Sequence, residues 1–230
     1  MKLPQLHETV LATTRYLEAL TVLNDEDCRA PSVLPGWSRG HVITHLSRNA
    51  DALTNLLHWG QTGVESPMYA SQEQRDADIE KGAGRSVDEL RDDAVSSWGR
   101  FLQAANELHV SRFDTEVSRT PGAAAFPVTK VCGMRRTEVE VHHADLDIGY
   151  TAYDWPEDFT AHLLERRRHE LADRPMTWRL TDTGETISLG DGGPEISGHS
   201  ADLAWWLIGR GTGEGLVSST GSLPDLGRWA

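Results

Sequence analysis

The sequence is poor in cysteine and lacks any long apolar run. Its 230 residues include only two cysteines, Cys28 and Cys132, which form no CxxC pair. A thiolate-rich zinc site and a disulfide framework are therefore unexpected, and we expect a cytoplasmic protein with reduced thiols. No segment approaches the ~20 apolar residues that a membrane-spanning helix requires. The N-terminus carries no apolar stretch, so we expect no signal peptide.

Positive charge is also scarce. The chain has 22 Lys and Arg against 35 Asp and Glu, which gives a formal net charge of −13. An acidic surface of this kind repels nucleic acid and anionic membranes, so we expect neither as a partner. A local basic pocket for a small anion remains open. Hydrophobic residues make up 38% of the chain, enough for the core of one large domain or two modest ones.

Helical periodicity dominates the first 150 residues. Apolar residues recur at helical spacing over residues 3–23, 38–59, 86–108 and 128–148, which predicts four long helices. Ser38 is placed to cap the second, and Ser86 with Glu89 forms a capping box for the third. Gly60 and Gly149 should end the second and fourth. A short turn of helix is expected within residues 24–35, and a short helix over 71–81. Four long helices predict a four-helix bundle, an architecture whose core commonly holds metal sites.

The pattern changes after residue 150. We expect a helix over 154–172, strands over 176–181, 185–189 and 195–198, a second helix over 200–208 and an extended tail. Asp182-Thr183-Gly184 signals a hairpin between the first two strands. The fold class is thus mainly α with an α+β C-terminal part. We predict two domains, a metal-binding bundle over residues 1–150 and a small α+β domain over 151–230.

The fourth helix carries a candidate pair of metal ligands. Glu138 and His142 are four residues apart, which puts them on one face one turn apart. Such pairs are common on surface helices, so the spacing alone is weak. The surrounding helix, however, offers little polar surface. A buried, unpaired carboxylate is costly, and a metal cation would compensate Glu138; Arg135 and Arg136 are the competing partners.

A third ligand is expected from the second helix. His45 borders the apolar stripe of that helix, and with Glu138 and His142 it makes a His/Glu/His set. Three protein ligands with an open fourth position are typical of catalytic zinc. A lone histidine at a core boundary is more often structural, and His41 is an alternative ligand one turn earlier; we prefer His45 because it lies further inside the helix. Asp145 is either an acceptor for a ligand histidine or a solvated acid.

Two arginines could bind an anion. Arg75 lies in the polar segment that would cover one end of the bundle. Arg210 stands between two glycines after a Trp-rich helix, where it could present its guanidinium to a carboxylate. A simpler explanation for Arg210 is a cation favoured by the helix dipole. Cys132 is off the ligand face, and we interpret it as a small core residue rather than a nucleophile.

Several motifs together resemble one family. They are GWSRGHVITHL at 36–46, RNADAL at 48–53, HW at 58–59, PMY at 67–69, EVEVHHADL at 138–146, GRG at 209–211, SSTG at 218–221 and RW at 228–229. This combination resembles the mycothiol-dependent maleylpyruvate isomerase family of the DinB-like metalloenzyme superfamily, over nearly the whole chain. The resemblance implies a DinB-like four-helix bundle followed by a small α+β domain similar to sterol-carrier-type folds. The loop after Leu108 departs from the family in length and composition.

The resemblance also implies a chemistry. It makes His45, Glu138 and His142 ligands of Zn2+, gives Arg75 and Arg210 catalytic roles, and makes mycothiol the thiol cosubstrate. We expect the protein to be a monomer. The implied reaction is the cis–trans isomerisation of maleylpyruvate, a small dicarboxylate, to fumarylpyruvate in gentisate-type aromatic degradation. Thiol S-transferases of the superfamily use the same ligands, so a mycothiol S-transferase acting on electrophiles is the alternative. A zinc-stabilised binding module, with a closed metal site, is a third possibility.

Overall fold

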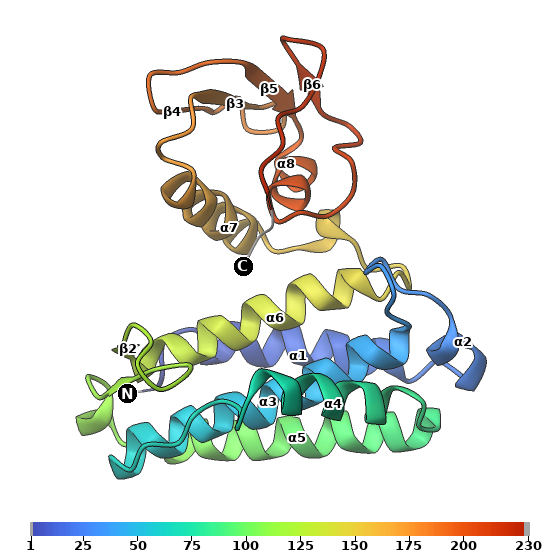
Figure 1. The fold of residues 1–230 in the computed structure, drawn as a ribbon, viewed down its shortest axis with the longest axis vertical. Coiled ribbons are helices and arrows are strands. Elements are labelled where there is room, and N and C mark those ends of the chain that lie inside the picture. Colours follow the sequence, from blue (N-terminus) through green and yellow to red (C-terminus); the bar gives the residue numbers. More distant parts are fainter. Residues whose placement is uncertain (1, 228–230) are drawn as a thin grey trace. The chain divides into compact units, whose positions relative to one another are not determined.

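The computed structural model describes residues 2–227 and is mainly helical, with a smaller α+β part in its C-terminal region (Figure 1). It separates into two compact units, Met1–Gly149 and Tyr150–Ala230. The predicted fold class is confirmed. Arg228 and Trp229, the last of the motifs, lie outside the described residues. Within residues 2–227, none of the helices combines the length with the apolarity that crossing a membrane demands.

The first unit is a helical bundle (Figure 1), and four of its helices have 15 residues or more. Its α-helices are α1 (Leu6–Leu20), α2 (Asp25–Arg29), α3 (Arg39–Thr62), α4 (Gln72–Ala83), α5 (Val87–Glu107) and α6 (Val131–Asp145). Helix α3 packs against α5 and α6, α1 packs against α6 and α5, and α4 lies along α3. The link from α5 to α6 contains η1 (Val110–Arg112), the antiparallel pair β1 (Glu116–Val117) and β2 (Phe126–Pro127), and η2 (Val128–Lys130).

Side-chain caps begin the helices where the sequence predicts them. The Ser38 hydroxyl accepts from the His41 backbone N–H at the start of α3. Ser86 and Glu89 form a complete capping box at the start of α5. Asn24 caps α2 in the same way, and this short helix is the predicted turn. Since a cap of this kind typically contributes about 1 kcal/mol, these residues fix where α3 and α5 begin.

The prediction that Gly60 ends α3 is wrong. The helix continues to Thr62, and Gly60 is buried inside it. A Cβ atom added at Gly60 would lie 2.6 Å from Cγ2 of Val128. Gly60 therefore allows a distant segment to pack closely on α3 instead of terminating the helix.

Two other helices of the first unit are shorter than predicted. Helix α1 spans Leu6–Leu20 instead of residues 3–23. Helix α6 begins after a 3₁₀ turn and ends at Asp145, because Asp147 takes a left-handed conformation with φ 54° two residues before Gly149. Aspartate tolerates this region better than most residues, so the helix ends before the glycine is reached.

The core holds α3, α5 and α6 against one another. Leu46 and Leu53 of α3, Leu90 and Phe101 of α5 and Val139 of α6 are all fully buried. Burying an apolar side chain of this size contributes about 1.5–3 kcal/mol. Because Leu46 and Val139 directly follow His45 and Glu138 in sequence, the same packing brings those two polar residues together.

The second unit combines two helices with a small sheet. It contains η3 (Ala152–Asp154), α7 (Glu157–Glu170), β3 (Met176–Leu180), β4 (Thr186–Leu189), β5 (Glu195–Gly198), α8 (Ser200–Leu207) and β6 (Val217–Ser218). The strand order is β4-β3-β5-β6; β3 and β5 are parallel and the other neighbours antiparallel. Three strands agree with the prediction. The fourth strand, β6, lies within the predicted extended tail. The sequence does not predict it, because two residues are too few to show an alternating pattern.

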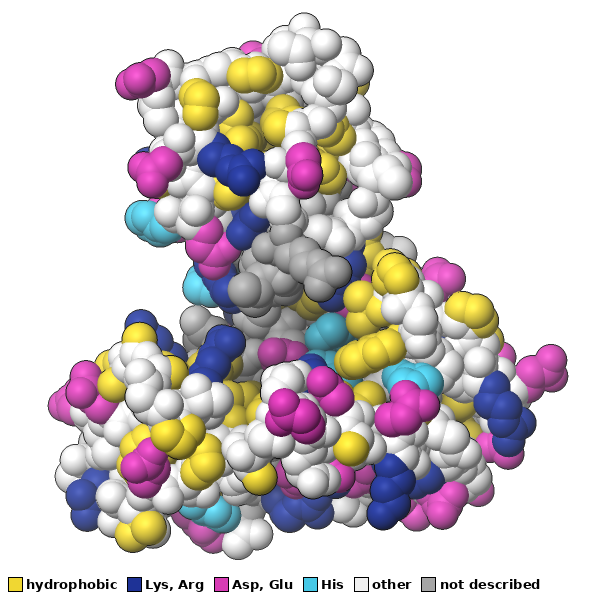
Figure 2. All heavy atoms as spheres, in the orientation of Figure 1, with side chains coloured by type: hydrophobic (Ala, Val, Ile, Leu, Met, Phe, Trp, Pro, Cys, Tyr) yellow, Lys and Arg dark blue, Asp and Glu magenta, His cyan; other side chains and the backbone are white. Residues whose placement is uncertain are grey.

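Acidic side chains (magenta) are scattered over the face of the molecule that Figure 2 shows, with basic side chains (dark blue) between them. Neighbouring charges of opposite sign partly cancel each other's field. An anion-binding site on such a protein therefore depends on individual arginines rather than on a broad basic surface.

Candidate metal centre

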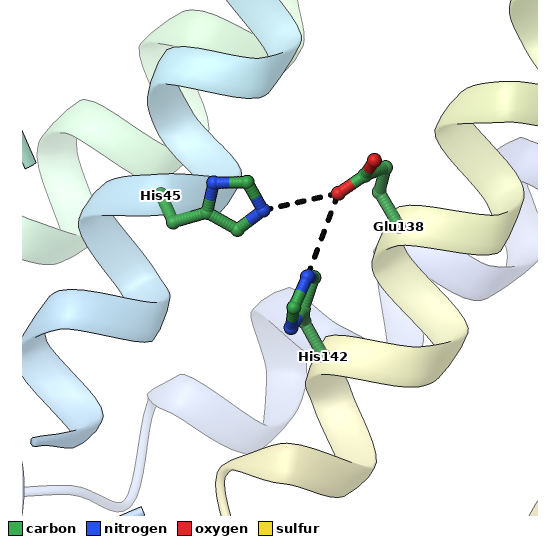
Figure 3. A group of neighbouring side chains, drawn as sticks. All are labelled: His45, Glu138 and His142. Atoms are coloured by element: carbon green, nitrogen blue, oxygen red, sulfur yellow. Dashed lines mark hydrogen bonds and ion pairs between the residues drawn. The ribbon is translucent and has the colours of Figure 1, made fainter. Parts of the chain in front are cut away.

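His45 of α3 and Glu138 and His142 of α6 point toward one another (Figure 3). Nε2 of His45 lies 3.0 Å from Oε2 of Glu138, and Nε2 of His142 lies 3.5 Å from the same oxygen. One ligand atom from each residue lies within 4.8 Å of the others. In the part of the chain that the structure describes, no other three His, Cys, Asp or Glu residues meet in this way.

The group is buried on one side and open on the other. His45 is only 4% exposed, and its ring centroid lies 5.7 Å from that of Trp37, just before α3. The side chains of Glu138 and His142 are 34% and 15% exposed. Solvent therefore reaches the carboxylate while protein covers the first histidine, which leaves an accessible side for a fourth ligand.

The distances from the Glu138 carboxylate to the two histidines fit zinc. Tetrahedral zinc with ligand bonds of about 2.0–2.1 Å places neighbouring ligand atoms about 3.3–3.4 Å apart. The distances of 3.0 and 3.5 Å from Glu138 Oε2 to the two histidine nitrogens lie on either side of that value. Two imidazoles and one carboxylate are also a usual donor set for a catalytic zinc with an open position. The residues present thus fit the metal that the resemblance implies.

Asp145 fixes the orientation of His142. Its Oδ2 atom lies 2.8 Å from Nδ1 of His142, and its side chain is completely buried. Since a carboxylate accepts, Nδ1 of His142 donates to Asp145, and this bond holds the ring with Nε2 on the side of Glu138. The interpretation of Asp145 as a solvated acid is wrong, and its interpretation as an acceptor for this histidine is confirmed.

The three residues shift one another's protonation. Burial disfavours the charged Glu138 carboxylate, but hydrogen bonds from His142 and His45 outweigh it and hold the pKa of Glu138 well below its usual value. Burial also opposes charge on His142, yet its contacts with Asp145 and Glu138 raise its pKa. Burial, together with the nearby His142, lowers the pKa of His45 to about 4. Near neutral pH the centre therefore contains a carboxylate and an uncharged His45.

The alternative ligand His41 is occupied elsewhere. Its Nδ1 atom accepts from the Ser38 backbone N–H at 3.1 Å, and its Nε2 atom lies 3.2 Å from Oε2 of Glu80. His41 thus belongs to the capping box of α3 and to a contact with α4. The structure favours His45 over His41 as a member of the cluster.

Arg135 is likewise committed to other partners. Its Nη1 atom donates to the Leu46 carbonyl at 2.7 Å and to Oδ1 of Asn49 at 2.9 Å. The side chain is buried, which lowers its pKa to about 10, so it stays charged near neutral pH. These bonds join α6 to α3. The hydrogen bonds to the Glu138 carboxylate come instead from the two histidines.

Arg75 reaches the centre from α4. Its Nη2 atom lies 3.3 Å from Nδ1 of His45, and its Nη1 atom donates to Oδ1 of Asp76 at 2.7 Å. Gly82 allows α4 to approach this closely, since a Cβ atom there would lie 2.4 Å from Cγ2 of Thr44. Arg75 is therefore adjacent to the centre, as its predicted role requires.

Arg210 belongs to the second unit. It follows α8, and its Nη1 atom donates to the Ile208 carbonyl at 3.4 Å. Its predicted role at the centre stays a prediction. Cys132 is fully buried in the bundle core, where burial raises its pKa to about 12, so its interpretation as a small core residue is confirmed.

Two aromatic residues near the centre were not predicted as functional. Trp37 covers His45, and the Tyr69 ring lies beneath Arg75, whose guanidinium carbon is 5.8 Å from the ring centroid. Burial raises the pKa of Tyr69, as does the charge of Glu138. Both residues occur in the quoted motifs, but neither spacing nor periodicity indicates a role for them, because their positions depend on how loops fold over the bundle.

Comparison with known proteins gives one family. The profile of the mycothiol maleylpyruvate isomerase N-terminal domain matches residues 10–147. Two crystal structures of the mycothiol-dependent maleylpyruvate isomerase, one of them a mutant with a histidine replaced by alanine, are each 30% identical to this chain with a TM-score of 0.89. Each match covers 98% of this chain and 95% of the other. Comparison with curated proteins finds no match.

Proposed function

The chain belongs to the mycothiol maleylpyruvate isomerase family, and from this premise we propose that it converts maleylpyruvate to fumarylpyruvate with mycothiol as cosubstrate, in the degradation of aromatic compounds. The observation that carries the proposal is the cluster of His45, Glu138 and His142, which is open on one side and has Arg75 beside it. This arrangement provides a place for a thiol next to a fixed positive charge.

The reaction needs a thiolate, because a carbon–carbon double bond does not rotate at a useful rate. Addition of a thiolate to one alkene carbon leaves a single bond and an enolate delocalised into the adjacent ketone. Rotation about that bond, followed by expulsion of the same thiolate, restores the double bond as the trans isomer and regenerates the thiol. The thiol is therefore neither oxidised nor consumed.

The chain's own thiols are not suited to this role. Cys28 and Cys132 are both free and buried, and burial raises the pKa of each. A thiol from outside the protein is thus required, and a low-molecular-weight thiol fits the cytoplasmic setting that we propose. Bound by His45, Glu138 and His142, zinc would supply a Lewis acid that keeps such a thiol deprotonated at neutral pH.

Arginines would hold the substrate. A chain with a net charge of −13 repels a dianion unless positive charge is concentrated at the site. Arg75 provides such a charge next to His45, where it can bind a carboxylate and stabilise the negative charge that develops on the enolate. We propose Arg210 as the second substrate-binding arginine. Asp145 would keep His142 oriented throughout the reaction.

A mycothiol S-transferase is the second candidate. It would use the same three ligands and the same thiol, but it would release a stable conjugate and accept varied electrophiles. Arginine beside the centre favours the isomerase, because a neutral electrophile has no carboxylate for Arg75 to bind. The two activities differ in whether the thiol is consumed, which makes them separable by experiment.

The test is an ultraviolet assay of maleylpyruvate conversion by zinc-loaded protein, with and without mycothiol. His45→Ala should abolish conversion, while His7→Ala, at an exposed position of α1, should leave it unchanged. Conversion that needs both mycothiol and His45, without loss of thiol, supports the isomerase. Thiol consumption by unrelated electrophiles without maleylpyruvate conversion would instead establish the transferase. If neither compound reacts, the catalytic proposal is wrong.

A further inference from the structure

A cleft in the second unit is lined by residues that play no part in the metal centre. Its volume is about 760 Å³, within the range of about 300–1,000 Å³ that is usual for small-molecule sites. Helix α7, the turn between β3 and β4, and the start of α8 supply its walls (Figure 1). Its lining residues all belong to one compact unit, Tyr150–Ala230, so the packing of that unit forms the cleft.

The floor of the cleft is apolar. Its least exposed lining residues are Trp155, Leu164, Leu180 and Ala201, each 5% exposed or less. The ring centroid of Trp155 lies 5.4 Å from that of Phe159, so packing behind it holds this large side chain in place. An apolar surface at the bottom of a cleft binds the apolar part of a ligand by removing both from water.

The rim of the cleft is acidic. The charged residues in its lining are Glu157, Glu165, Asp182 and Glu185, all of them exposed, and no lysine or arginine of the described chain lines it. Glu165 lies 3.2 Å from a guanidinium nitrogen of Arg168. Asp182 accepts from the backbone N–H and the hydroxyl of Ser200 at 3.0 and 2.7 Å. Because Asp182 already occupies the start of α8, that helix end does not offer an anion site.

The other two rim carboxylates have no basic partner. Within residues 2–227, neither Glu157 nor Glu185 forms a salt bridge. Glu157 lies in the first turn of α7, and Glu185 lies just before β4. They therefore place negative charge on two different walls of the cleft. A cleft with apolar walls and charge of one sign concentrates the electric field and attracts ligands of the opposite sign.

An aromatic side chain is held at the same rim. Tyr153 is 60% exposed, yet two contacts restrain it. Its hydroxyl donates to Oδ2 of Asp202 at 2.7 Å, and its ring centroid lies 4.8 Å from that of His199. The face of an aromatic ring attracts a cation, so Tyr153 adds a second feature that favours positive charge.

We propose that the second-unit cleft binds an organic cation in which an ammonium group is attached to an apolar or aromatic body. The apolar body lies on the floor beside Trp155 and Leu164, and the ammonium group lies at the rim among Glu157, Glu185 and Tyr153. The site is independent of the proposed isomerase activity, and its negative charge repels the dicarboxylate substrate of that reaction.

A metal ion fits the cleft less well than an organic cation. Among the residues that the structure describes, no three of the rim side chains bring ligand atoms within 4.8 Å of one another. The negative charge is thus spread around the mouth above an apolar floor. A bare metal ion has no use for that floor, whereas an amine with an apolar body contacts both parts.

The test is isothermal titration calorimetry of the full-length protein with three ligands of similar shape. Phenylbutylamine, phenylbutanol and phenylbutyrate carry a positive, a neutral and a negative head group. Phenylbutylamine should bind about 10-fold more tightly than phenylbutanol, as expected for partly solvated charge pairs together with one cation–π contact. Phenylbutyrate should bind most weakly. High salt should reduce the preference for the amine, because it screens exposed charges.

Charge variants then locate the site. Glu157→Gln and Glu185→Gln should each weaken binding of phenylbutylamine about 2- to 5-fold and leave binding of phenylbutanol unchanged. Asp191→Asn is the matched control, because it removes an exposed charge of the same unit that does not line the cleft; it should change neither affinity. Tyr153→Leu should weaken binding of the amine more than binding of the alcohol.

Three outcomes would overturn the inference. They are the absence of phenylbutylamine binding, equal or tighter binding of phenylbutanol or phenylbutyrate, and Glu157→Gln and Glu185→Gln variants that bind the amine as tightly as Asp191→Asn does. Conversion of maleylpyruvate depends on other residues, so the proposed function would stand in each case. Loss of that conversion would, conversely, leave the binding of the amine untouched.

Discussion

Asp145 offers the sharpest test of how the centre is built. Its carboxylate is fully buried and lies 2.8 Å from Nδ1 of His142. A hydrogen bond that involves a charged group contributes about 1.5–3 kcal/mol, and each 1.4 kcal/mol corresponds to a factor of about ten in affinity. Asp145→Ala should therefore weaken zinc binding about 10- to 100-fold, the range found for partners of metal-bound histidines. Asp145→Asn should lose less, about 10-fold, because its amide oxygen can still accept from Nδ1.

The assay is competition for zinc between each metal-free variant and a chelator of known affinity, with the free energy of unfolding measured separately. Asp147→Asn is the matched control. It removes the same charge from an exposed position two residues away, and asparagine tolerates the φ of 54° found there. If folded Asp145→Ala and Asp145→Asn both bind zinc as tightly as Asp147→Asn, the orienting role of Asp145 is refuted.

Three further predictions concern packing, pH and charge. Gly60→Ala should destabilise the protein by about 1–3 kcal/mol in urea unfolding, because its Cβ would lie 2.6 Å from Val128 Cγ2. The control Gly99→Ala, with open space around it, should stabilise the protein by up to about 1 kcal/mol. Equal effects of the two substitutions would contradict the packing argument. Zinc affinity should fall as the pH drops through the raised pKa of His142, because the metal and the proton compete for the imidazole; titrations between about pH 5 and 8 with no slope would be inconsistent with this. Glu138→Gln keeps the shape of the side chain but removes the anionic ligand, so it should weaken zinc binding more than Asp145→Asn does, and the opposite order would show that the carboxylate charge is not what holds the metal.

Local signals predicted most of the helices, but not all of their ends. Ser38 and Ser86 lie directly before apolar periodic segments, and a cap needs only the residues next to it. The predicted end of α3 was wrong because Gly60 allows Val128 to pack closely on the helix, and no local pattern reveals this contact. The end of α6 depends on Asp147 adopting positive φ, a choice made by the surrounding structure rather than by the residue type alone.

The candidate site likewise contains residues that local patterns indicate and residues whose place depends on tertiary packing. Glu138 and His142 are related by helical spacing, and His45 by its place at the edge of an apolar stripe, so sequence reasoning could propose all three. Two interpretations of Asp145 stayed open in the sequence, because helical spacing puts it near His142 without showing that its side chain is buried. The proximity of Arg75 to His45 follows from how α4 packs on α3. The sequence indicated only that Arg75 lies in a segment covering one end of the bundle, and the family resemblance added a catalytic role.

Two arginines close to the centre differ in how they are used. Arg135 is buried and bonded to Leu46 and Asn49, partners that hold α3 and α6 together whether or not a metal is present. Arg75 instead lies beside the centre itself, with its Nη2 atom 3.3 Å from Nδ1 of His45 and its Nη1 atom bonded to Asp76. The first arginine therefore holds together the two helices that carry the cluster, whereas the second presents its charge next to the cluster, where the proposed dicarboxylate substrate needs a cation.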